Sequence, residues 1–139
     1  MSDLRIYLDT SAYLAILLGE SEAEEIQKTI KSVVLCSSTF LFLEAERNLV
    51  RLVREKKVKE SIYEAAYDQL KNDFEILILR DFTPDLCLTK EFPPAKTPRS
   101  SDLIHLRTAA WFQRNGGLVR FLTLDSQQRS AAKDLGLPV

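Results

Sequence analysis

The chain has 139 residues, of which 45% are hydrophobic and 28% charged, and its 19 Lys and Arg against 20 Asp and Glu give a formal net charge of −1. This length predicts one domain spanning 1–139, and the apolar content excludes a disordered chain. The nearly balanced charge argues against a protein that binds duplex DNA through one strongly basic face, although it is compatible with local basic patches.

The first half of the chain alternates strand and helix patterns. A compact apolar run that ends at Asp9 predicts a buried strand, and Thr10 or Ser11 can cap the helix that follows. Ser21, with Glu24 three residues later, forms a capping-box pattern. The predicted elements are a strand over 4–8, helices over 10–18 and 21–31, a strand over 32–36, and a long helix that is capped within 37–39 and ends at 54.

The second half continues this alternation and contains an expected exposed loop over 91–102, which holds three of the five prolines. The predicted elements are a helix over 60–72, a strand over 75–79, a short helix opening at Pro84, a helix capped by Ser100 or Ser101 and stopped by Asn115-Gly116-Gly117, a strand over 119–124, a helix capped by Ser126 and ending near 135, and a short edge strand over 137–139. This order predicts an α/β fold, namely a three-layer α/β/α sandwich with a mostly parallel sheet of four to five strands.

The two cysteines and the start of the chain indicate the cellular compartment. Cys36 and Cys87 both lie among apolar residues without metal-ligand spacing, so we expect reduced, half-buried core positions. The first residues have no positive segment followed by an apolar run, and no stretch approaches the ~18 apolar residues of a membrane span. These features predict a cytoplasmic protein without membrane association.

Four carboxylates are candidates for chemistry. Asp9 and Asp125 each follow a predicted strand, and ligands of open parallel sheets bind beyond the carboxyl ends of the strands. Either one alone is also compatible with an ordinary N-cap. Asp102 lies in the first turn of its helix, where the helix dipole favours an acid. Glu44 lies within the apolar stretch FLFLEAE, where burial of a carboxylate is costly without a partner, whereas we expect Glu46 to be solvated.

Carboxylates that share one crevice repel one another unless cations neutralise them. The chain offers no cluster of His or Cys, and ligand sets made only of oxygen favour Mg²⁺ or Mn²⁺. Sites of this kind suit phosphoryl transfer, in which two metal ions about 3.5–4 Å apart stabilise the attacking and leaving oxygens. The acids therefore favour metal-dependent chemistry on a phosphodiester.

Four short passages occur in order along the whole chain. They are LDTSA from residue 8; Ser38, Glu44 and Arg47; RSSDLIHL from residue 99; and TLD from residue 123, followed by AA and LGLPV. Together these passages resemble PIN-domain nucleases, and most closely the VapC-type ribonuclease toxins of bacterial toxin–antitoxin pairs. Two features depart from the family pattern: Arg107 stands where relatives carry a small residue, and the Pro-rich loop is unusual.

The resemblance implies Mg²⁺-dependent endonucleolytic cleavage of RNA, with Mn²⁺ as a substitute ion, and a small antitoxin that covers the active-site groove. It also implies a homodimer. Asp9 corresponds to the central metal ligand. The remaining acids of the catalytic quartet correspond to Glu44, Asp102 and Asp125, and hydroxyls that orient ligands or water correspond to Thr10, Ser11 and Thr123.

A basic stripe follows Glu44 along the long helix. Arg47, Arg51 and Arg54 lie at i+3, i+7 and i+10 from it, which predicts a track for RNA phosphates or, equally simply, a solvated helix face. His105, the single histidine, is compatible with a general base or a satisfied core position. Likewise, Tyr13 and Trp111 are compatible with base stacking or with core packing.

Two other functions stay open from the residues alone. One is a catalytically silent interaction module that binds a partner through the same groove. The other is a phosphatase or phospho-acceptor domain with Asp9 as the nucleophile, although the DxDxT pattern of one such class is absent because residue 11 is Ser.

Overall fold

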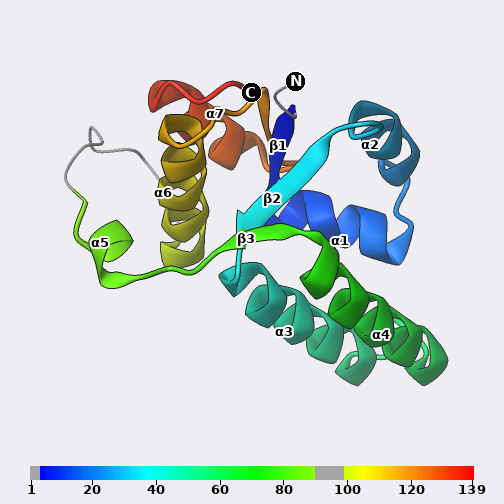
Figure 1. Ribbon diagram of the computed structural model, residues 1–139. Coiled ribbons are helices and arrows are strands. Elements are labelled where there is room, and N and C mark those ends of the chain that lie inside the picture. Colours follow the sequence, from blue (N-terminus) through cyan, green and yellow to red (C-terminus); the bar gives the residue numbers. More distant parts are fainter. Residues whose placement is uncertain (1–3, 90–98) are drawn as a thin grey trace.

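Strands and helices alternate along the computed structural model, which describes residues 4–89 and 99–139 (Figure 1). The elements of these residues, in chain order, are β1 (Arg5–Leu8), α1 (Thr10–Leu18), α2 (Ala23–Thr29), β2 (Val34–Ser38), α3 (Phe40–Arg54), α4 (Glu60–Ile76), β3 (Ile78–Arg80), α5 (Pro84–Cys87), α6 (Ser100–Arg114), β4 (Arg120–Leu122) and α7 (Ser126–Asp134). Of the loop expected over 91–102, residues 91–98 lie outside the described residues, and 100–102 form the start of α6.

The described strands form one parallel sheet in the order β3-β2-β1-β4. β1 is central, and its residue Leu8 is paired with Leu122 of β4. Because all the strands run the same way, their carboxyl ends meet at one edge of the sheet. The residues that follow β1 and β4 are therefore neighbours, and the backbone N–H of Asp9 donates to the carbonyl of Leu122 at 3.2 Å.

Helices cover both faces of the sheet, so the predicted three-layer α/β/α sandwich is confirmed (Figure 1). Successive side chains of a strand point to opposite faces. Tyr7 points to the face covered by α6 and α7, where its ring stacks on Phe121 with 5.4 Å between centroids. Ile6 and Leu8 point to the other face, which packs against α1, α3 and α4.

Two helices begin at an aspartate rather than at the hydroxyl residue expected to cap them. The carboxylate of Asp9 accepts from the backbone N–H of Ala12 and caps α1. Asp125, instead of the predicted Ser126, caps α7. Both aspartates have extended backbones one residue before the helix, which is the geometry of an N-cap. The N-cap interpretation of these two acids is therefore confirmed, and it is compatible with a further function.

Two other predicted caps are wrong. The capping box of Ser21 and Glu24 does not form, because α2 begins after Glu22, whose backbone is already helical. Ser100 and Ser101 lie inside α6, whose N-cap makes no side-chain hydrogen bond.

Several strand boundaries also differ from the prediction. β2 starts at Val34 rather than at 32, and Ser32 has a φ of 64°, which interrupts the extended backbone. α4 extends to Ile76 because its helical apolar spacing continues to Phe74, whose ring packs edge-on against Phe42. This leaves three residues for β3, and β4 is likewise three residues long.

The chain end forms no fifth strand. Phe121 donates to the carbonyl of Pro138 at 2.5 Å, but proline has no N–H with which to continue a ladder. Both cysteines were expected to be half-buried in the core. Cys87 is instead exposed on short α5, and Cys36 is a core residue that is fully buried. None of the described helices is long and apolar enough to cross a bilayer.

Candidate active site

A pocket of about 160 Å³ lies at the carboxyl edge of the sheet. It is lined by Asp9, Thr10, Ser11, Leu14, Glu44, Asn48, Arg99, Ser101, Asp102, His105 and Asp125. All four predicted acids are in this set, although they come from four separate parts of the chain. The topology brings them together because β1 and β4 are adjacent and because α3 and α6 begin at the same edge.

Asp9 is the most deeply buried of the four acids, with 4% of its surface exposed. Its Oδ1 accepts from the Ser11 hydroxyl at 2.7 Å and from the Ala12 N–H at 3.1 Å. Burial raises the pKa of Asp9, and the charge of His105 and hydrogen bonds from Thr123, Ser11 and Ala12 oppose this rise. These contacts hold the carboxylate in one orientation beneath the pocket.

Asp125 lies in the turn between β4 and α7 and lines the same pocket as Asp9. Its Oδ1 accepts from the N–H groups of Gln127 at 2.8 Å and Gln128 at 3.3 Å. The Thr123 hydroxyl accepts from the Asp125 N–H at 3.1 Å and lies 3.2 Å from the Ser11 hydroxyl. Two of the predicted supporting hydroxyls, Ser11 and Thr123, therefore connect the turns that carry the two aspartates.

Glu44 lies one turn into α3 and is bound from two sides. Its Oε1 accepts from the Thr10 hydroxyl at 2.7 Å and lies 2.7 Å from Nε2 of His105. Burial would raise the pKa of Glu44, but the hydrogen bond and charge of His105, with hydrogen bonds from Thr10 and Ser101, leave that pKa below its ordinary value. A carboxylate in such apolar surroundings needs a hydrogen-bonding partner, and His105 and Thr10 are the partners of Glu44.

Asp102 differs from the other three acids because one of its buried carboxylate oxygens has no hydrogen-bond partner among the described residues. This oxygen is Oδ2, and the nearest cation to it is Nε of Arg99 at 3.7 Å. Burial raises the pKa of Asp102; Arg99 lowers it, and the charges of Asp125, Asp9 and Glu44 raise it further. The negative charges of the other three acids therefore act on Asp102 across the pocket.

The donor chemistry of this pocket fits a hard divalent cation. The acids supply only oxygen, and the buried Oδ2 of Asp102 lacks the partner that a buried carboxylate needs. Within the described ranges, no three His, Cys, Asp or Glu side chains are arranged as a ready-made metal cage. Asp9, Asp125 and Glu44 each accept a hydrogen bond from a protein group, which holds these three carboxylates in place.

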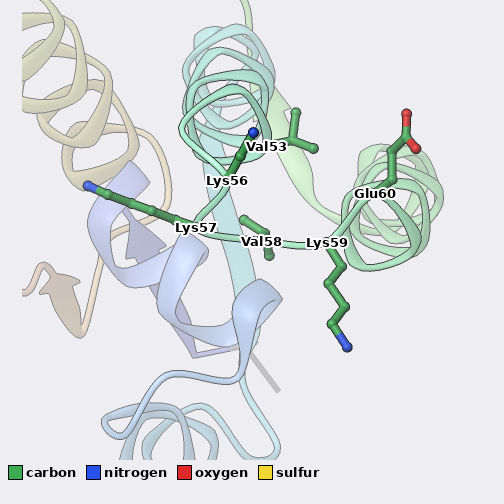
Figure 2. Close-up of a pocket in the computed structure, with 6 residues that line it drawn as sticks. All are labelled: Val53, Lys56, Lys57, Val58, Lys59 and Glu60. Carbon is green, nitrogen blue, oxygen red and sulfur yellow. The ribbon is translucent and has the colours of Figure 1, made fainter.

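The predicted basic stripe lies outside the pocket. Arg47, Arg51 and Arg54 are exposed on α3, and Arg51 is paired with Glu55 at 3.2 Å. Figure 2 shows a second hollow, of about 560 Å³, at the turn between α3 and α4, where lysine side chains extend in different directions. This hollow is lined by Val53, Lys56, Lys57, Val58, Lys59 and Glu60. The cationic surface therefore continues from α3 into the turn.

The structure places both candidate stacking aromatics in structural roles. The hydroxyl of buried Tyr13 donates to Asp73 at 2.6 Å, and the Trp111 ring lies under the guanidinium of Arg80, 4.8 Å from its centroid. Neither residue lines the pocket.

The unusual Arg107 also has a structural explanation. Its guanidinium donates to the carbonyl of Cys87 at 2.6 Å and to that of Leu86 at 3.3 Å, which connects α6 to the end of α5. This departure from the family pattern therefore lies away from the pocket.

Some pocket residues were missed as site residues in the sequence. Arg99 and Ser101 flank Asp102, and Asn48 follows Glu44 by one helical turn, so their spacing from the acids was the available signal. Gln128 was also missed; its buried side chain donates to the carbonyl of Asp102 at 2.9 Å and so joins α7 to the start of α6.

Comparisons with known proteins address the fold and the family of the chain. The fold is similar to the crystal structure of Mycobacterium tuberculosis VapC20, a sarcin–ricin loop cleaving toxin, with a TM-score of 0.57 and 17% identity over 91% of this chain and 94% of that one. No curated protein sequence matches the chain. The sequence matches the PIN domain family over residues 6–134, which is most of its length. The chain therefore belongs to the PIN domain family.

Proposed function

We propose that the protein is a metal-dependent endoribonuclease that hydrolyses RNA phosphodiester bonds. The observation that carries this proposal is the meeting of Asp9, Glu44, Asp102 and Asp125 in one pocket of a PIN-domain fold. The other three acids raise the pKa of Asp102, and one of its oxygens is buried without a partner among the described residues; both properties are expected of a carboxylate that binds a cation. These four residues are accordingly our candidate catalytic residues.

Asp9, Asp102 and Asp125 would hold Mg²⁺ or Mn²⁺, with Glu44 in support. When bound, such an ion supplies Lewis-acid activation of water and stabilises the charge that develops on the phosphate. The chain itself orients the acids: Ser11 and Ala12 hold Asp9, and the start of α7 holds Asp125. In our mechanism, the hydroxyls of Thr10, Ser11 and Thr123 position these carboxylates and their water.

We propose that RNA approaches along α3. Arg47 and Arg54 are exposed and form no ion pair within the described part of the chain, and the lysines of the following turn extend the positive surface. With a rise of about 1.5 Å per residue, Arg54 lies about 15 Å along the helix from Glu44, a distance that spans several phosphates of a single strand. Arg51 belongs to the same surface, although Glu55 partly neutralises it.

We further propose a toxin–antitoxin role, in which a small antitoxin covers the groove and the chain forms a homodimer. The support is the family membership together with the fold shared with VapC20, which is itself a toxin that cleaves the sarcin–ricin loop. An antitoxin that covers the acidic pocket would block access of RNA to all four carboxylates at once.

The test is RNA cleavage by the wild-type chain and by Asp9→Asn, each with Mg²⁺ and with EDTA. We expect cleavage by the wild type with Mg²⁺ alone. Asp9→Asn keeps the shape of the side chain and an oxygen that can cap α1, so its loss of activity would reflect the lost charge. Cleavage that persists in EDTA and in Asp9→Asn would refute the metal-dependent site.

A silent interaction module is the second candidate, and the absence of a ready-made metal cage among the described residues favours it. Thermal denaturation with increasing Mg²⁺ separates the two. A ligand that binds the folded state raises the melting temperature, so the nuclease should be stabilised and the silent module should not respond.

A further inference from the structure

A buried polar chain connects the core of the protein to the pocket. The Tyr7 hydroxyl lies 2.7 Å from Nδ1 of His105, and Nε2 of the same ring lies 2.7 Å from Oε1 of Glu44 and 2.9 Å from the Thr10 hydroxyl. Tyr7 and His105 are buried, with 0% and 2% of their surfaces exposed. The sequence left open whether His105 is a general base or a core residue, and the structure places it behind Glu44.

The hydrogen bonds around Nε2 determine which ring nitrogen carries a proton. The Thr10 hydroxyl donates its only proton to Oε1 of Glu44, so toward the ring it can act only as an acceptor. The Glu44 carboxylate is also an acceptor. Because both neighbours of Nε2 are acceptors, Nε2 must carry the proton that both contacts require.

When the imidazole is neutral, the other nitrogen, Nδ1, carries no proton and accepts from Tyr7. A phenol hydroxyl is a donor at neutral pH, and the Tyr7 hydroxyl lies 2.7 Å from Nδ1. The Tyr7 ring is fixed between Phe121, stacked at 5.4 Å, and His105, edge-on at 5.8 Å. A rigid core tyrosine therefore determines both the orientation and the tautomer of the imidazole.

We propose that Tyr7 and His105 are positioning residues, in which Tyr7 fixes the Nε2–H tautomer of His105 and this N–H holds the Glu44 carboxylate against the pocket wall. The proposal rests on the proposed function, because it gives Glu44 the orientation that the site needs. Hydrogen bonds behind metal-site carboxylates typically change affinity or activity by about 10- to 100-fold when they are removed.

The test compares two substitutions that each remove one phenol hydroxyl from a buried tyrosine. Tyr7→Phe removes the donor to His105, whereas Tyr13→Phe removes the 2.6 Å bond to Asp73, away from the pocket. We expect Tyr7→Phe to lower kcat for RNA cleavage about 10-fold or more, with little change in KM. Tyr13→Phe should keep the wild-type kcat. Equal kcat values for the two variants would overturn the proposal.

A spectroscopic readout tests the same chain without cleavage. Because the protein has one histidine, nitrogen NMR of the imidazole reports His105 alone. We expect the Nε2–H tautomer in the wild type, with the Nε2–H signal shifted in Glu44→Gln and the Nδ1 signal shifted in Tyr7→Phe. A proton found on Nδ1, either alone or together with one on Nε2, would overturn the proposal.

The two readouts also separate this proposal from the proposed function. If the wild type cleaves no RNA, the proposed function fails, while the NMR spectra still decide whether Tyr7 and His105 hold Glu44. If Tyr7→Phe does not fold, the comparison of His105→Gln with His105→Leu replaces it. The glutamine amide can still donate a hydrogen bond to Glu44, so His105→Gln should have a higher kcat than His105→Leu. Equal activity of these two variants would contradict the positioning role.

Discussion

The salt dependence of RNA binding should decrease when Arg47 and Arg54 are removed, the two arginines of α3 that form no ion pair with the described residues. On single strands, the slope of log affinity against log salt is about −0.7 for each phosphate contact. Arg47→Gln or Arg54→Gln should therefore reduce the slope by about 0.7, and the double substitution by about 1.4. At about 0.1 M salt, one such contact corresponds to roughly fivefold in affinity. Arg51→Gln should have a smaller effect because Arg51 is paired with Glu55 at 3.2 Å.

The assay is fluorescence anisotropy of a labelled single-stranded RNA over a series of KCl concentrations. An Asp9→Asn background prevents cleavage during the titration. Lys31→Gln is the matched control, because Lys31 is exposed, forms no ion pair within the described part of the chain, and lies in the turn before β2, at the opposite edge of the sheet. An unchanged slope in the double arginine variant, or an equal change in the Lys31 control, would refute the phosphate track.

Three further predictions concern thiols, caps and charge repulsion. A thiol reagent should modify one cysteine in the folded chain and two after denaturation, because Cys87 is exposed while burial raises the pKa of Cys36 to about 12. Asp125→Ala should lower the free energy of unfolding in urea by about 1 kcal/mol through the lost cap of α7, whereas Asp125→Asn should keep that stability and lose RNA cleavage. Asp102→Asn should raise the melting temperature in EDTA at neutral pH. Because the pKa of Asp102 is raised in the folded state, its ionised form destabilises the fold at high pH, and this gain should disappear as the pH falls below the ordinary value of 3.8.

Most of the fold could be predicted from the sequence, because its apolar runs and helical spacings agree with the strands and helices of the structure. The errors occurred where local patterns are ambiguous. The run EILIL fits a strand as well as the end of a helix, and the packing of Phe74 on Phe42 decides for the helix as far as Ile76. The caps of α1 and α7 were displaced by one residue because aspartate and the hydroxyl residues after it are both good N-caps.

The four acids could be proposed from sequence because each occupies a recognisable place beside a strand end or a helix start. The contacts that hold them could not. Tyr7 reads as an ordinary core residue of β1, and its link to Glu44 depends on His105, 98 residues further along the chain. The raised pKa of Asp102 likewise depends on the order of the strands, because β4 lies beside β1 and brings the acids together. No single segment of the sequence contains this order.

The central claim is that these four acids form one metal-dependent ribonuclease site. The most direct measurement is a Mg²⁺ titration followed by two signals, the rate of RNA cleavage and the melting temperature of the chain. We predict that both signals rise with the same midpoint in the wild type, and that Asp102→Asn loses the cleavage and the Mg²⁺-dependent rise in melting temperature together. Cleavage by Asp102→Asn at the wild-type rate, or without added metal, would contradict the account.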